Sequence, residues 1–361
     1  MNPADSTAVY FLPSRPDEPD EALATRLAAE LDRYGWIGQI VTAHDMVAIK
    51  THFGEEGTTG YVRPVCFRPI GERVRAAGGL PFLTDTQTLY NGKRKNAVEH
   101  LMLAGSHGFS LEATGIPLIM ADGLLGDEEV TVPIAGKLYA QVAIASLIVK
   151  AQALVVVSHF TGHLGTGFGA TLKNMGMGCA SRRGKLTQHS TAKPKIKAKK
   201  CARCGQCVRW CPEQAIVLEE KAARIDQGKC IGCGECLAVC RFDAVGYNWG
   251  ATYEELQRKV AEHALGVATG KEKKLLCLNF LTRLSKDCDC MAGFTSLGPD
   301  IGVVIGTDPV AVDAASLDLV ESRLGRPLGE VAYDIPTRVQ LEHAEAVGLG
   351  SQRYRLETLG G

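Results

Sequence analysis

Short apolar runs alternate along the chain with segments in which apolar residues recur at helical spacing. The short runs predict strands at residues 9–12, 47–53, 81–84, 117–120, 153–158, 274–280 and 302–306. The helical spacing predicts helices at residues 21–34, 70–77, 96–104, 139–151, 253–264 and 310–324. Strands that alternate with helices are typical of an α/β fold with a mostly parallel sheet flanked by helices.

A cysteine-rich segment interrupts this alternation, and the α/β pattern resumes after it. The segment begins with a basic stretch, residues 193–200 (KPKIKAKK), which we expect to be a solvated linker. We therefore predict one α/β domain in two parts, residues 1–192 and 250–361, with a module inserted at residues 193–249. The basic linker is also a candidate docking patch for an acidic redox partner protein.

Composition narrows the classes of function. The 361 residues carry 40 basic and 40 acidic side chains, so charge gives no indication of nucleic-acid binding. The most apolar stretch, residues 142–157, contains Ser146, Lys150 and Gln152, which argues against a membrane span. The N-terminus has acids and prolines where a signal peptide has basic and apolar residues, so we expect a cytoplasmic location. Disulfides are not expected there, and clustered cysteines then indicate metal binding.

Eight of the 13 cysteines form two runs of the pattern C-x2-C-x2-C-x3-C, which start at Cys201 and Cys230. Tandem runs of this kind bind two [4Fe–4S] clusters in bacterial ferredoxins, where the fourth cysteine of each run binds the other cluster. An α+β ferredoxin-like module with two clusters is therefore expected. The predicted ligands are Cys201, Cys204, Cys207 and Cys240 for cluster 1, and Cys230, Cys233, Cys236 and Cys211 for cluster 2.

Zinc is the alternative for paired cysteines, but structural zinc sites use four ligands in two separated pairs. Two runs of four fit two clusters better, and Pro212 follows the first run as in ferredoxins. Arg241 stands where the second run would often have proline, a departure that removes no ligand. Gly205, Gly232 and Gly234 are expected in tight turns that bring backbone N–H groups to the sulfurs.

Five cysteines lie outside the two runs. Cys66 and Cys277 have apolar surroundings and are expected to be small buried side chains. Cys179 belongs to a glycine-rich polar loop, where it is either incidental or faces a ligand. Cys288 and Cys290 are one residue apart in a polar stretch, and they are candidates for binding a soft metal or for shuttling as a dithiol pair.

Histidines and acids follow several predicted strands, which is where open α/β sheets bind their ligands. His159 and His163 come directly after strand 153–158 in a glycine-rich loop that resembles neither a dinucleotide-binding motif nor a P-loop. We expect a catalytic site, or an additional metal or cluster site, built from His159, His163, Cys179, Cys288 and Cys290. Weaker candidates are His52, His107, His189, Asp85 and Asp122.

Seven segments in order resemble the DUF362 family, over residues 47–320. They are VAIKTHFGE from Val47, PFLTDT from Pro81, ADGLLG from Ala121, SHFTGH from Ser158, LKNMGMGC from Leu172, CDC from Cys288 and TDPVAVD from Thr307. Family members often have lysine where this chain has Thr161. The resemblance implies an iron–sulfur protein of anaerobic-type metabolism, in which the His159/His163, Cys179 and Cys288/Cys290 motifs recur. The α/β part also resembles, distantly, lactate-racemase-type proteins.

Most of the chain lies outside the two cysteine runs, whereas simple electron carriers are short. We therefore expect an iron–sulfur oxidoreductase in which electrons pass through two clusters to a site in the α/β domain, with a small-molecule substrate. The alternatives are a non-catalytic electron-transfer subunit that docks a partner enzyme, and a metal- or cluster-delivery factor that uses Cys288 and Cys290 as a transfer dithiol. A homo-oligomer is compatible with the sequence.

Overall fold

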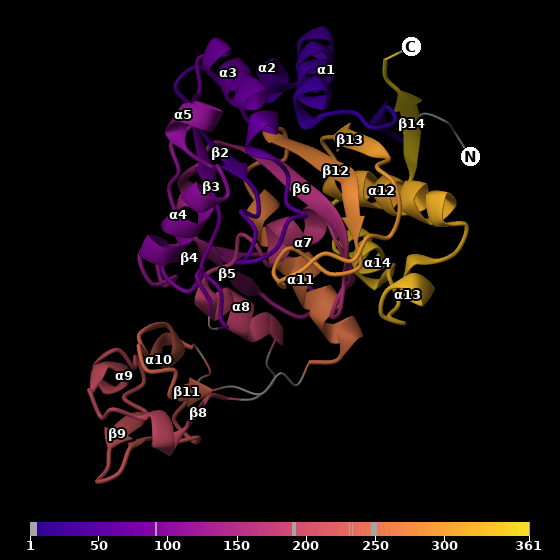
Figure 1. Ribbon diagram of the computed structural model, residues 1–361. Helices are drawn as coiled ribbons and strands as arrows, with labels where there is room; N and C mark the ends of the chain where they lie inside the picture. The colour runs from indigo at the N-terminus through magenta and orange to yellow at the C-terminus, as the bar shows by residue number, and fades with distance from the viewer. Residues whose placement is uncertain are drawn as a thin grey trace.

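The computed structural model describes residues 6–90, 92–189, 193–230, 232, 234–246 and 251–360. An eight-stranded sheet lies at its centre (Figure 1), in the order β14-β1-β13-β12-β6-β2-β3, with β7 paired to the end of β6. Its strands are β1 (Thr7–Pro13), β2 (Met46–Lys50), β3 (Leu80–Thr84), β6 (Ala153–His163), β7 (Gly167–Gly169), β12 (Leu275–Ser285), β13 (Gly302–Gly306) and β14 (Tyr354–Thr358). All but β7 and β13 run in one direction, so the sheet is mostly parallel.

Helices cover both faces of this sheet (Figure 1), as an α/β fold requires. Alternate residues of β6 divide between two cores, Leu154 and Val156 on one face and Val155 and Val157 on the other. The first core is completed by α7 (Thr171–Gly176), α11 (Tyr253–Ala268), α12 (Pro309–Leu324) and α14 (Val339–Ala346). The second is completed by α1 (Asp20–Tyr34), α2 (Trp36–Ile40) and α3 (Arg68–Ala76).

Shorter elements connect these layers. They are η2 (Pro64–Cys66), α4 (Ala97–Ser106), α5 (Leu111–Thr114), α6 (Ser146–Lys150), α8 (Arg182–His189), α13 (Leu328–Val331) and the antiparallel pair β4 (Glu129–Pro133) and β5 (Gln141–Ala145). Local sequence signals mark where the long helices begin. Thr252 and Glu255 form a capping box at α11, and Asp308 accepts the N–H groups of Val310 and Ala311 at the start of α12.

Three sequence-based predictions of elements are wrong. Residues 139–151 form β5 and α6 instead of one helix, because the apolar run fits either period and the pairing of β5 with β4 decides. Residues 117–120 form only an isolated bridge, between Leu118 and Leu83, because Pro117 has no N–H with which to extend the pairing. The predicted loop at His159 and His163 is the end of β6, which β12 and β7 extend by pairing with it.

The cysteine module is the segment between α8 and α11. Its described elements are β8 (Lys195–Ile196), η3 (Ala198–Lys200), α9 (Gln206–Arg209), β9 (Ile216–Leu218), β10 (Ala223–Ile225), α10 (Glu235–Ala238) and β11 (Val245–Gly246). Antiparallel pairing of β8 with β11 brings the entering and leaving chain together, and the module lies beside α8 (Figure 1). Strands from both sides of this segment belong to the one large sheet.

In the described ranges, no helix combines the length and the apolar character that crossing a bilayer requires.

Candidate functional site

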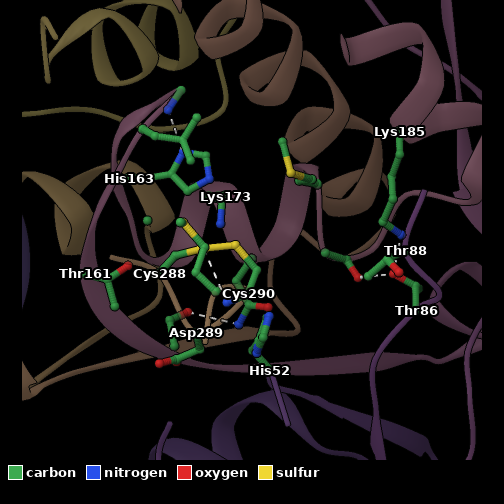
Figure 2. Close-up of a pocket in the computed structure, with 18 of the residues that line it drawn as sticks. His52, Thr86, Thr88, Thr161, His163, Lys173, Lys185, Cys288, Asp289 and Cys290 are labelled. Carbon is green, nitrogen blue, oxygen red and sulfur yellow. Dashed lines mark hydrogen bonds between the residues drawn. A yellow bond between two sulfur atoms is a disulfide. The ribbon is translucent and has the colours of Figure 1, made fainter. Parts of the chain in front are cut away.

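A cavity of about 540 Å³ opens at the carboxyl ends of β2, β3 and β6. Its wall includes Lys50 at the end of β2, Asp85 just after β3, and both His159 and His163 in β6. The loop that carries Cys288 also lines the cavity (Figure 2). Separate strand ends therefore meet in one concave space, which is where open α/β folds bind small molecules.

One wall of the cavity is a buried ion network. The ammonium of Lys50 lies 2.8 Å from Asp85, and Arg94 lies 3.4 Å from Asp85 and 3.2 Å from Glu55. Burial by itself raises the pKa of Asp85, but the positive groups around it, Lys50 foremost, hold that pKa well below its usual range. Asp85 is therefore a fixed negative charge, and Lys50 is further held by the side-chain oxygen of Asn174 at 2.7 Å.

His159 anchors the loop that bears the two cysteines. Its Nδ1 lies 2.9 Å from Oδ2 of Asp289, and its Nε2 lies 2.8 Å from the carbonyl oxygen of Thr282. Both ring nitrogens face oxygen atoms of the protein, so neither is directed to the cavity. His159 is thus placed to hold Asp289, which stands between Cys288 and Cys290.

His163 is fixed in one tautomer by backbone donors. Its Nδ1 accepts the N–H groups of Gly165 and Thr166, both at 3.0 Å. A backbone N–H can only donate, so Nδ1 carries no proton. Burial, followed by the charge of Lys173, holds the pKa of His163 well below its usual range, so the ring is neutral and its proton is on Nε2.

Cys288 and Cys290 are joined by a disulfide in the wall of the cavity (Figure 2). The sequence-based expectation that this chain has no disulfide is therefore wrong for this pair. Cys288 is buried and Cys290 is half-buried. A ring nitrogen of His163 and the two sulfurs lie within 4.8 Å of one another, so the thiol pair and this histidine do meet.

Lys173 extends from α7 into the same part of the cavity (Figure 2). Among the described residues, no hydrogen bond or ion pair holds its ammonium group. Burial and the charge of Arg94 lower the pKa of Lys173 to about 8, although Asp289 raises it. Gly169 leaves room for this side chain, since a Cβ there would lie 3.1 Å from its Cδ.

Other candidates from the sequence have different surroundings. Cys179 does not line the cavity; it is buried, its thiol points to the carbonyl of Asn174 at 3.6 Å, and burial raises its pKa to about 11. Asp122 is buried behind the wall, where it accepts the N–H of Gln87 at 2.9 Å. His107 binds the carbonyl oxygen of Phe53 at 2.8 Å, away from the cavity. His52 and His189 do line the cavity, and Cys66 and Cys277 are buried as expected.

Cysteines of the two runs lie together in mixed groups. Cys211 of the first run shares a small hollow with Cys230 and Cys236 of the second. Burial is the largest cause that raises the pKa of Cys207. The nearby thiols Cys240 of the second run, and Cys201 and Cys204 of the first, raise this pKa further. Cys233 lies outside the described residues.

Backbone N–H groups point at several of these sulfurs. Ala215 donates to Cys211 at 3.2 Å, Ala223 donates to Cys201 at 3.4 Å and Gly232 donates to Cys230 at 3.4 Å. Such donors stabilise thiolate ligands and tune iron–sulfur clusters. The three turn glycines have the left-handed φ that the sequence predicts, +76° for Gly205, +74° for Gly232 and +80° for Gly234.

The cysteine module contacts the domain that holds the cavity. Leu89 lines the cavity and also belongs to the apolar cluster that contains Leu186, Ile216 and Leu237. Lys95 of the α/β domain also pairs with Asp243 of the module. The apolar cluster that contains Leu89 thus lies between the cavity and the cysteine groups.

The chain matches the family model described as "Domain of unknown function (DUF362)" over residues 47–318, and it belongs to this family. No curated protein matches it. Among solved structures, it is similar to the lactate racemase apoprotein of Thermoanaerobacterium thermosaccharolyticum, with 13% identity, a TM-score of 0.41, and coverage of 88% of this chain and 56% of that one. It is also similar to a Thermotoga maritima protein, with 8% identity, a TM-score of 0.43, and coverage of 85% and 59%. The chain thus spans less than two thirds of either structure's length.

The sequence reasoning missed the basic side chains of the cavity. Lys50, Arg94, Lys173 and Lys185 all line it. Lys50 and Lys173 lie within two of the segments that resemble DUF362, but neither was singled out as a site residue. Lys50 is also the last residue of an apolar strand, whereas only the packing of α7 against β6 places Lys173 beside the disulfide.

Proposed function

We propose that this protein is an iron–sulfur oxidoreductase that passes electrons through two [4Fe–4S] clusters to a small anionic substrate in the strand-end cavity. The clusters would be held by the eight cysteines of the module, Cys201, Cys204, Cys207 and Cys240 for one, and Cys230, Cys233, Cys236 and Cys211 for the other. Each cluster would supply one electron at a time. The chain itself supplies the cavity, its charges and its hydrogen-bond donors.

The observation that carries the proposal is the mixing of the two cysteine runs. Cys211 of the first run shares a small hollow with Cys230 and Cys236 of the second. Cys240 of the second run is near enough to Cys207 of the first to raise its pKa. A bacterial-type pair of clusters requires this exchange of the fourth ligand, and two independent zinc sites do not. The backbone donors to Cys201, Cys211 and Cys230 are the environment that thiolate–iron bonds need.

An enzyme is favoured over a simple carrier because the α/β domain has a built cavity beside the module. Its volume is that of a small-molecule site. Four basic side chains line it, Lys50, Arg94, Lys173 and Lys185, against the two carboxylates Asp85 and Asp289. The excess of positive charge, with Lys173 lacking a partner in the described part of the chain, supports an anionic substrate such as a carboxylate.

The residues of the cavity then have separate tasks. Lys173 would bind the negative group of the substrate. The network around Asp85 would keep Lys50 and Arg94 in place, since their charges are already paired. His163, neutral and protonated on Nε2, would donate a hydrogen bond without adding charge.

Paired cysteine variants test the cluster assignment. Cys201→Ser with Cys240→Ser removes two ligands from one cluster, so about four irons per chain and one EPR-active cluster should remain after anaerobic purification. The matched pair Cys201→Ser with Cys211→Ser removes one ligand from each cluster and should damage both. If the second pair retains one intact cluster and the first retains none, the ligands are not exchanged, and if wild type holds zinc without iron, the proposal fails.

A further inference from the structure

We propose that the Cys288–Cys290 disulfide is a redox-active acceptor inside the cavity, which takes one electron from each of the two clusters and becomes the dithiol that faces the substrate. This inference rests on the proposed function, because it names the group that receives the electrons. It also assigns a reaction to a pair of sulfurs that the cluster ligands do not include.

A structural role explains this disulfide poorly. Only Asp289 separates the two cysteines, so the bond closes a minimal loop and restricts the unfolded chain very little. The bond lies in the cavity wall, where structural disulfides have no need to be, and Cys290 is half-buried there. A disulfide that is open to a substrate site is of the kind that exchanges electrons.

A metal site explains the same group poorly. Binding through Nδ1 of His163 would break its hydrogen bonds from Gly165 and Thr166, since that atom has one lone pair. Binding through Nε2 would require moving the proton to Nδ1, where it would meet the same two N–H groups. His163 therefore presents an N–H to its surroundings. One of its ring nitrogens lies within 4.8 Å of both sulfurs, which gain negative charge on reduction.

The loop that carries the pair is held so that both sulfurs stay at the cavity when their bond opens. His159 binds the carboxylate of Asp289 at 2.9 Å, and the N–H of Glu55 binds the carbonyl oxygen of Asp289 at 2.8 Å. The N–H of Cys290 also lies 3.4 Å from the sulfur of Cys288, where it can stabilise a thiolate. The first two of these contacts do not involve the sulfurs, so they can persist when the S–S bond opens.

The reduction balances with groups that the site has. The disulfide would take up two electrons, one from each reduced [4Fe–4S] cluster, so that the S–S bond breaks and two protons complete two thiols. The ammonium of Lys173, in the same cavity, supplies one proton, and water entering the open cavity supplies the other and then restores Lys173. The Nε2–H of His163 would stabilise the sulfur that is negatively charged before it is protonated, and His163 would keep its own proton.

Counting electrons tests the proposal on the full holoprotein. Anaerobic titration with dithionite should show that wild type takes up about four electrons per chain, two in the clusters and two in the disulfide. Cys288→Ser and Cys290→Ser should each take up about two, with cluster EPR signals like those of wild type. Equal uptake by wild type and both variants, with clusters present, would overturn the proposal and leave the proposed function standing.

A second measurement reports the two thiols directly. The anaerobic holoprotein is equilibrated in dithiothreitol buffers of stepped potential, quenched with acid and alkylated, and the mass of the 284–297 region reports the reduced fraction. We expect a reversible two-electron transition between disulfide and dithiol. His163→Leu should shift its equilibrium constant at least roughly tenfold toward the disulfide, and His163→Gln, which keeps an N–H, should shift it less. A pair that is never reduced, or that binds zinc stoichiometrically once reduced, contradicts the proposal. Absence of iron in native protein would sink the proposed function instead.

Discussion

The Nδ1 of His159 lies 2.9 Å from Oδ2 of Asp289, and this contact ties the end of β6 to the loop that carries both cavity cysteines. The other ring nitrogen of His159 faces the carbonyl oxygen of Thr282, so both ring nitrogens are engaged within the protein. A histidine that looks like a metal ligand in the sequence is therefore placed to hold Asp289.

Removing the acid of this pair should loosen the loop. Asp289→Ala leaves the buried ring of His159 without its acceptor, so we expect the free energy of unfolding to fall by about 2 kcal/mol. Asp289→Asn keeps an oxygen acceptor and should lose about half as much. Chemical denaturation measures both variants. Equal stability of wild type and Asp289→Ala would show that the contact does not hold the loop.

Lys173 makes anion binding depend on pH. Its pKa is lowered to about 8, so its positive charge is lost as the pH rises through that value. We expect the affinity for oxalate, measured by calorimetry, to fall by up to about tenfold between pH 7 and pH 9, because the charged fraction of a group with this pKa falls about tenfold over that range. The charged or titratable groups that line the cavity with Lys173 are Lys50, Arg94, Lys185, Asp85, Asp289, His52, His159, His163, His189, Tyr90 and Tyr253.

Two variants assign this transition to Lys173. Lys173→Arg keeps its charge throughout the range, so its affinity should stay nearly constant with pH. Lys173→Met should bind weakly at every pH. A full transition near pH 8 in Lys173→Met would place the titrating group elsewhere, with Lys185 the first candidate because its pKa is also lowered to about 8.

Asp313 positions the helix that carries Lys173. Its carboxylate accepts the N–H groups of Thr171 and Leu172 at the start of α7, both at 2.8 Å. Asp313→Ala should lower the free energy of unfolding by about 2 to 3 kcal/mol and weaken oxalate binding, because buried donors lose their acceptor. The control is Asp308→Ala, which removes the comparable cap of α12 and lies outside the cavity lining. It should lower the free energy of unfolding by about 1 kcal/mol and leave oxalate binding unchanged. The same loss of binding in both variants would contradict a specific role for α7.

Gly169 leaves the space that Lys173 uses. A Cβ at this position would lie 3.1 Å from Cδ and 3.5 Å from Nζ of Lys173, so Gly169→Ala should push that flexible side chain aside. We expect several-fold weaker oxalate binding with a change in unfolding free energy below about 0.5 kcal/mol. Gly105→Ala, where a Cβ would meet nothing within 4 Å, is the control. Unchanged binding in Gly169→Ala would mean that Lys173 does not hold the anion.

The elements with long, regular apolar patterns were predictable from the sequence. Strand 153–158 and helix 310–324 are present as β6 and α12, since burial on both faces of a sheet and a capping Asp308 leave few alternatives. Residues 139–151 were not predictable in the same way. Their continuous apolar character fits a helix or a strand, and a partner strand with little pattern of its own, β4, settles the choice.

The sequence singled out the thiols and histidines of the candidate site but not its hydrogen bonds or its charge. His163 was expected at a strand end and Cys288 in a polar stretch, and both line one cavity. The tautomer of His163 depends on two backbone N–H groups of the following turn, which no side-chain pattern encodes. Lys50 binds Asn174 across 124 positions of sequence, so the charge of the cavity exists only in the folded chain.

We propose that two [4Fe–4S] clusters are the source of electrons for the cavity. Iron and acid-labile sulfide, quantified per chain after anaerobic purification, test it most directly. We expect about eight of each, and an EPR signal of reduced clusters after dithionite. Stoichiometric zinc, or a chain that holds neither iron nor sulfide after anaerobic purification and anaerobic reconstitution, would contradict the account.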